Sequence, residues 1–242
     1  MPATVLGEFL GTFVLLLLGN GVVAGALLTH SKAQQAGWLA ITTGWALAVF
    51  AGVTTAVALG APGELNPAVT FANVLGGART AGDAMWHVAA QLAGAVAGAT
   101  LVWLHYLPHW RATDDPALKL ACFSTAPAIR EPASNLLSEA IGTFVLVLLA
   151  LALGSAGVAG ATPATNLGGA LVAAVVWGIG LSLGGTTGYA INPARDLGPR
   201  LAHALLPVAG KGSSDWGYAA IPVLGPLAGA AAAALLWRAA MA

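Results

Sequence analysis

Two copies of one triplet carry the clearest chemical signal in the sequence: Asn66-Pro67-Ala68 and Asn192-Pro193-Ala194. Asparagine is a favoured N-cap and proline is favoured at the first helical position, so each triplet predicts the start of a helix. One such triplet would be an ordinary helix start in a loop. Two copies in one chain indicate a duplicated structure instead.

A second set of residues has the order found in serine hydrolases. Residues 180–184 read Gly-Leu-Ser-Leu-Gly, and Asp196 and His203 follow Ser182 in the order Ser, Asp, His. The nucleophile elbow needs a turn from strand to helix, whereas these residues lie in an apolar stretch that predicts a helix. An intramembrane serine hydrolase remains an alternative, and packing of two small residues, Gly180 and Gly184, between helices is the simpler interpretation.

The sequence contains few residues at spacings that would bind a metal or a cofactor. His105 and His109 have a spacing that suits metal ligands, but Pro108 interrupts the helix between them and no further ligand is near. Cys122 is the single cysteine, which excludes an internal disulfide. The chain has no Gly-x-x-x-x-Gly-Lys-Ser/Thr loop for nucleotide phosphates. We expect neither a metal nor a cofactor.

The composition places most of the chain in a lipid bilayer. Of its 242 residues, 58% are hydrophobic and 7% are charged, whereas a globular domain usually has about 25% charged residues. Nine basic and nine acidic residues cancel, and the basic residues form no cluster. A nucleic-acid partner is therefore excluded.

Long stretches without charge locate the membrane passes, because one charge at mid-bilayer costs about 2.5–3.5 kcal/mol. The stretch between Glu139 and Arg195 has 55 residues, enough for two passes of about 20 residues each, with a break over 154–163. All passes are predicted to be helical, since a helix satisfies its own backbone in lipid. The predicted spans are 4–28, 36–60, 83–106, 134–154, 165–185 and 217–239.

The sequence contains an internal repeat. Residues 8–15 (EFLGTFVL) return as 139–146 (EAIGTFVL), an offset of 131, and the triplets return at an offset of 126. Each half has an odd number of passes, so the second half enters the membrane in the opposite direction, and the functional site of such an inverted repeat lies near the midplane. We expect one domain, 1–242, with repeats 1–106 and 134–242 joined by the connection 107–133.

Each triplet opens a segment too short to cross the membrane, 66–76 and 192–203. About 10–12 residues at 1.5 Å each reach half-way through the hydrocarbon core. We expect two half-helices that meet N-terminus to N-terminus, with Asn66 and Asn192 at the junction and two positive dipole ends directed at one point. Non-helical backbone at that depth is tolerated only where it lines a water-filled cavity, so a pore follows.

With these motifs the sequence resembles the aquaporin and glycerol-facilitator family over essentially its whole length. The resemblance rests on the paired boxes, the Glu-x-x-Gly-Thr start of each half and Arg195 after the second box. It implies an all-α membrane protein with six transmembrane helices plus two re-entrant half-helices, assembled as a homotetramer with one pore per subunit. It also implies that Glu8 and Glu139 anchor the box loops. The alternative for these two glutamates is a proton relay.

The resemblance places a selectivity filter outside the boxes, formed by Trp45, Gly180, Tyr189 and Arg195. Trp45 and Tyr189 would form an apolar corner for the carbon backbone of a polyol, while Arg195 donates to its hydroxyls from the opposite wall. Water-specific members have His at the position of Gly180, where this chain has no side chain. Asp196 marks the glycerol-conducting branch, and its simpler interpretation is a charge that offsets the helix dipole. The box-supporting positions are Pro67, Ala68, Pro193, Ala194, Glu8, Glu139 and Asp196.

One residue departs from the family pattern. The family usually has His two residues before the first box, whereas this chain has Glu64 in the sequence Gly-Glu-Leu-Asn-Pro-Ala. We expect Glu64 to line the inner vestibule, and its protonation to alter conductance or the tolerance of acidic solutes.

The sequence thus predicts a passive channel, not an enzyme, for small uncharged polyols such as glycerol, with some water permeation. Urea, dihydroxyacetone and undissociated lactic acid are further expected solutes. By a rule formulated for aquaporin-type pores themselves, ions and protons are excluded. A water-selective aquaporin and a secondary transporter, which also uses inverted repeats, are the alternatives. The family implies the plasma membrane with both termini cytoplasmic, although counts of Lys and Arg in the loops favour the reverse orientation.

Overall fold

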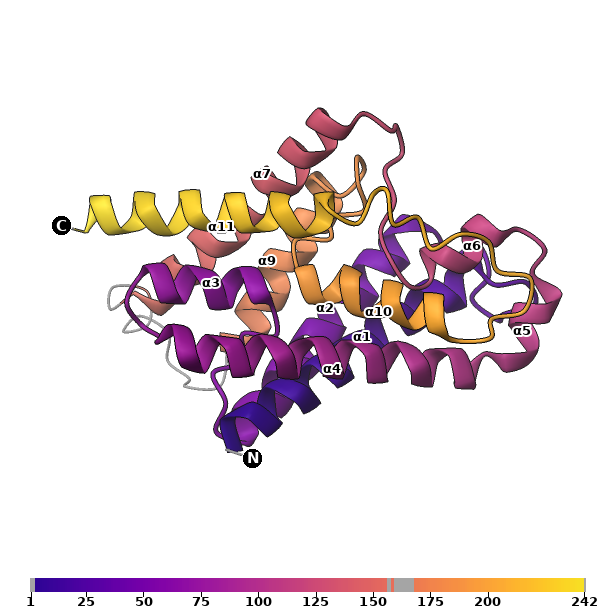
Figure 1. Ribbon diagram of the computed structural model, residues 1–242, viewed down its shortest axis with the longest axis horizontal. Helices are drawn as coiled ribbons and strands as arrows, with labels where there is room; N and C mark the ends of the chain where they lie inside the picture. The colour runs from indigo at the N-terminus through magenta and orange to yellow at the C-terminus, as the bar shows by residue number, and fades with distance from the viewer. Residues whose placement is uncertain (1–2, 156–157, 159–167, 242) are drawn as a thin grey trace.

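The computed structural model describes residues 3–155, 158 and 168–241, and within these ranges the chain is helical and contains no strand (Figure 1). This agrees with the all-α membrane fold expected from the sequence. In chain order the helices are α1 (Ala3–Leu27), α2 (Gly37–Ala58), α3 (Pro67–Leu75), α4 (Ala81–His105), α5 (Leu107–Ala112), α6 (Pro116–Ala121), α7 (Pro132–Gly154), α9 (Gly168–Ser182), α10 (Pro193–Leu205) and α11 (Ile221–Ala240).

The long helices match the predicted spans. Five of them, α1, α2, α4, α7 and α11, are long and apolar enough to cross a membrane. The sixth span corresponds to α9, an apolar helix of 15 residues in the described part of the chain. The predicted break at 154–163 and the first residues of the span 165–185 lie largely outside the described residues. The connection 107–133 contains the short helices α5 and α6.

Both half-helices begin at their triplets. Asn66 is the N-cap of α3 and Asn192 the N-cap of α10, and in each case the asparagine Oδ1 accepts the backbone N–H two residues later. Proline follows at the first helical position, as the sequence predicted. The second half-helix runs two residues beyond the predicted end at 203, to Leu205.

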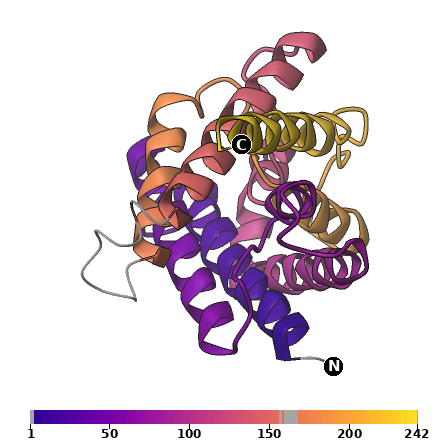
Figure 2. The ribbon, with the colours of Figure 1, turned by 90° about the vertical axis from the view of Figure 1, so that its left-hand side faces the viewer.

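The two halves pack in matching ways. Helix α1 lies against α2 and α4, and α7 lies against α9 and α11. Each half-helix also crosses to the other half, since α3 packs on α11 and α10 packs on α4 (Figures 1 and 2). The half-helices therefore lock the repeats together, with their N-termini toward the middle of the molecule.

Glycines allow the tightest of these contacts at equivalent places. A Cβ on Gly94 would collide with the carbonyl oxygen of Phe9 in α1, and a Cβ on Gly229 would collide with the carbonyl oxygen of Ala140 in α7. Backbones that approach this closely need small residues in membrane helices. These glycines hold α4 on α1 and α11 on α7.

Two lysines fasten the loops at one end of the bundle. Lys119 is buried, and its Nζ donates to the carbonyl oxygens of Ala209 (2.6 Å) and Gly210 (3.3 Å). Lys211 Nζ donates to three carbonyl oxygens at the end of α10, those of His203, Ala204 and Leu206, at 2.6–2.8 Å. A cation at a helix C-terminus also offsets the dipole. The connection 107–133 is thus tied to the loop that follows α10.

Candidate functional site

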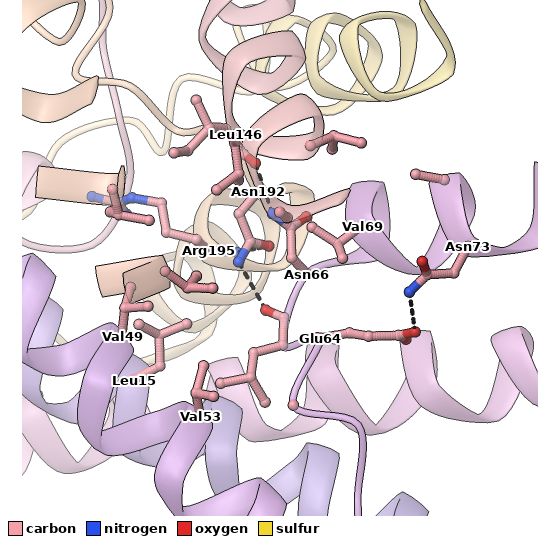
Figure 3. A pocket seen from close by; sticks show the side chains of 18 of the residues that line it. Leu15, Val49, Val53, Glu64, Asn66, Val69, Asn73, Leu146, Asn192 and Arg195 are labelled. Atoms are coloured by element: carbon pink, nitrogen blue, oxygen red, sulfur yellow. Dashed lines mark hydrogen bonds between the residues drawn. The ribbon is translucent and has the colours of Figure 1, made fainter. Parts of the chain in front are cut away.

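The two asparagines of the boxes meet at the centre of the molecule. Asn66 Nδ2 donates to the carbonyl oxygen of Ile191, and Asn192 Nδ2 donates to that of Leu65, both at 2.8 Å (Figure 3). Each carboxamide NH2 has two N–H groups, so one N–H of each asparagine remains for a further acceptor. The expected tip-to-tip junction is present, and it is reciprocal between the halves.

Two buried glutamates hold the loops that carry the boxes. Glu8 accepts from the backbone N–H groups of Glu64 (2.9 Å) and Leu65 (2.8 Å), and Glu139 accepts from those of Ala190 (2.9 Å) and Ile191 (2.8 Å). The loops need such anchors because Leu65 (φ 50°) and Ile191 (φ 43°) adopt left-handed backbone, which is strained for a side chain of this kind. The anchoring geometry favours the box-support role over a proton relay.

One cavity of about 310 Å³ passes the asparagine junction. One of its ends, which we call the Arg79 mouth, is lined by Pro62, Glu64, Asn73, Ala78 and Arg79. Its other end, which we call the Arg195 filter, is lined by Trp45, Tyr189 and Arg195. Between them the wall is mostly apolar: Leu15, Val49, Val53, Val69, Leu146, Val147, Val172 and Val176.

The arginine of the filter lies on the tryptophan ring. Arg195 Cζ is 4.2 Å from the centroid of the Trp45 ring, and Nη1 donates to the carbonyl oxygen of Phe123 at 3.1 Å. The expectation that Arg195 faces Trp45 from an opposite wall is therefore wrong. The reason is cation–π attraction, which is strongest for tryptophan and draws the guanidinium onto the ring face.

Tyr189 fills the space beside Gly180. A Cβ on Gly180 would lie 2.8 Å from Tyr189 Cζ, so the missing side chain at 180 makes room for the phenol ring. Trp38, which we did not expect here, contacts Tyr189 edge-on with centroids 5.8 Å apart and donates from Nε1 to the Gly180 carbonyl oxygen at 3.0 Å. Tyr189 Oη is buried and has no hydrogen-bond partner among the described residues.

Asp196, the residue after Arg195, fixes the start of α10 through buried contacts with Thr125 and Arg200. Its Oδ2 accepts from the backbone N–H (2.8 Å) and the hydroxyl (2.7 Å) of Thr125, and Arg200 Nε donates to Oδ1 at 2.7 Å. The side chains of Asp196 and Arg200 are both fully buried. The sequence analysis did not predict that Thr125 and Arg200 bind the Asp196 carboxylate. For Arg200 a signal was available, because it follows Asp196 by four residues on one helix.

Glu64 lies at the Arg79 mouth within a polar cluster. Its carboxylate accepts from Asn73 Nδ2 (2.6 Å), Thr70 Oγ1 (2.7 Å) and Arg79 Nε (2.9 Å), and His87 Nδ1 is 3.5 Å away. These four partners were not expected from the sequence. Thr70 and Asn73 lie three residues apart on α3, which begins just after Glu64, whereas Arg79 and His87 are brought to it only by the fold.

The hydrolase interpretation fails on geometry. Ser182 is exposed at the end of α9, His203 Nδ1 is paired with Ser214 Oγ at 2.8 Å, and the carboxylate of Asp196 is occupied by Thr125 and Arg200. The order of these residues in the sequence therefore does not assemble a triad. Within the described residues no cluster of three His, Cys, Asp or Glu side chains could hold a metal ion.

Comparison with known proteins agrees with this architecture. The family model described as "Major intrinsic protein" matches residues 2–237. The chain belongs to this family. Members that it resembles include glycerol uptake facilitator protein 3 of Lactiplantibacillus plantarum, 54% identical over 96% of this chain and 95% of that protein. The glycerol uptake facilitator protein of Streptococcus pneumoniae is 50% identical over 96% of each chain.

One solved structure has the same fold. The aquaglyceroporin from Plasmodium falciparum superposes with a TM-score of 0.85 and is 27% identical, covering 97% of this chain and 94% of that chain. The chain is accordingly a multi-pass membrane protein with the inverted repeat of this family, and it is a channel and not an enzyme.

Proposed function

We propose that the chain is a passive transmembrane channel for small uncharged polyols, glycerol first, with water as a lesser permeant. The observation that carries this proposal is the cavity that runs from the Arg79 mouth past Asn66 and Asn192 to the Arg195 filter. The names of its relatives, glycerol uptake facilitators, support the same solute.

The wall of the cavity suits a molecule with one apolar and one polar side. Valines and leucines face the path along its length, and donors of Asn66, Asn192 and Arg195 interrupt this apolar wall. A polyol places its carbon backbone on the apolar wall and its hydroxyls on the donors, so it passes without leaving its polar groups unsatisfied.

Positive potential along the path opposes cations. The guanidinium of Arg195 has a carbonyl oxygen and an aromatic ring as its contacts, and the N-termini of α3 and α10 point toward the junction. Helix N-termini carry roughly half a positive charge each. This arrangement is the one known to exclude cations and protons from aquaporin-type pores.

We further propose that Glu64 lines an inner vestibule, that the protein is a homotetramer in the plasma membrane, and that both termini face the cytoplasm. The burial of basic residues weakens the loop count that favours the reverse orientation. Lys119 and Arg200 are buried, and Lys211 is bound to three carbonyl oxygens. Residues that the fold uses internally are a poor guide to membrane orientation, because the positive-inside rule concerns free loop charges.

The test is stopped-flow light scattering on proteoliposomes with a panel of glycerol, urea, dihydroxyacetone, lactic acid and water. We expect glycerol flux well above that of empty liposomes, non-saturating and indifferent to ion gradients. Saturation at low glycerol concentration or dependence on a sodium or proton gradient would indicate a secondary transporter. Fast water flux without glycerol flux would indicate a water-selective aquaporin.

A further inference from the structure

The Arg79 mouth of the pore contains an arginine whose charge is neutralised. Arg79 Nε donates to Glu64 Oε1 at 2.9 Å, and the two side chains are 17% and 3% exposed. Both residues line the cavity. Any solute that uses the cavity passes this ion pair.

Three further contacts fix the carboxylate in place. Asn73 donates to the oxygen that Arg79 uses, and Thr70 donates to the other one. The backbone N–H of Glu64 is held by Glu8 at 2.9 Å. Because the carboxylate is bound at both oxygens and through its backbone, it cannot turn away from Arg79.

Arg79 has capacity for a second ligand. Of its five N–H donors, only Nε has a partner among the described residues. A guanidinium without a carboxylate binds phosphate or carboxylate groups in a bidentate manner. That attraction would be stronger at this partly buried position than in bulk water, because the effective dielectric constant is lower.

We propose that Glu64 is a specificity residue that prevents small anions from binding at the Arg79 mouth. By neutralising Arg79 it keeps phosphate-like anions out of the path of neutral solutes, and it confines uncompensated positive charge to the Arg195 filter. This inference rests on the proposed channel function. It assigns Glu64 an electrostatic role that its place before the first box does not indicate.

The test measures inhibition of glycerol flux by inorganic phosphate in proteoliposomes, with phosphate on both sides and chloride at equal ionic strength as reference. Glu64→Gln keeps the size of the side chain and removes its charge. We expect phosphate to inhibit this variant at a roughly tenfold lower concentration than the parent, which corresponds to ~1.4 kcal/mol. Glu64→Gln combined with Arg79→Gln should return phosphate sensitivity to the parent level.

A matched control is Asp83→Asn, which removes one negative charge from an exposed residue, four positions after Arg79, whose carboxylate accepts from Thr80 and not from Arg79. It should behave as the parent does. Equal phosphate sensitivity in the parent and Glu64→Gln would overturn the proposal, as would sensitivity that persists in the double variant. Glu64→His gives a second variant without the carboxylate if Glu64→Gln does not elute as a single species. Glycerol flux of the parent without phosphate tests the channel function separately.

Discussion

The two ends of the pore hold an arginine in different ways. At the filter, Arg195 rests on the Trp45 ring and donates to a carbonyl oxygen, so its contacts carry no negative charge. At the opposite mouth, Arg79 is paired with the Glu64 carboxylate. One end therefore presents a free positive charge, and the other presents donors without net charge.

This difference stands against an otherwise repeated scaffold. The glutamate anchors, the asparagine caps and the reciprocal bonds between asparagines and loop carbonyls occur in both halves at matching positions. The features shared by both halves build the pore, and the contacts of Arg79 and Arg195, which each occur in one half only, distinguish its two ends. We therefore expect changes in the shared features to affect stability, and changes at either end to affect selectivity.

The largest effect should come from the shared anchors. Glu139→Ala leaves the backbone N–H groups of Ala190 and Ile191 without partners, and Glu8→Ala does the same at Glu64 and Leu65. Each buried donor left unsatisfied costs about 1–3 kcal/mol, so each variant should lose about 2–6 kcal/mol. Thermal unfolding in detergent measures this. If only one of the two variants unfolds at the temperature of the parent, the two halves are not anchored alike.

Next in size is the effect of narrowing the filter. Gly180→His combined with Trp45→Phe places a side chain where the Tyr189 ring now lies. Glycerol flux should fall by about tenfold, or ~1.4 kcal/mol, and water flux by less. Gly178→Ala is the matched control, since a Cβ there has open space on the same helix. Equal loss of both fluxes would count against the assigned filter.

A smaller effect should separate the two arginines. Arg195→Gln removes the uncompensated charge, so cation leak should rise several-fold, as electrostatic barriers of this kind predict. The double variant Glu64→Gln with Arg79→Gln removes a neutral pair and should exclude cations as the parent does. Conductance in planar bilayers measures both. Equal leak in the two proteins would erase the proposed difference between the ends.

Much of the scaffold could be predicted from local sequence. The cost of charge in lipid located the spans, the capping preferences of Asn and Pro located both half-helices, and the repeat of residues 8–15 at 139–146 required their inversion. Each of these signals lies within a short segment. These signals could be interpreted without knowing which residues pack against each segment.

The two ends of the pore were decided by tertiary structure. Arg79 reaches Glu64 because α3 turns back into α4, Thr125 reaches Asp196 from the long connection, and Tyr189 takes the space that Gly180 leaves. These contacts join residues that share no local pattern. The sequence by itself determined which segments enter the membrane and where they break, because the cost of charge in lipid and the capping preferences of Asn and Pro act within short segments. Which charges are neutralised along the path depends on distances that only the packed chain defines.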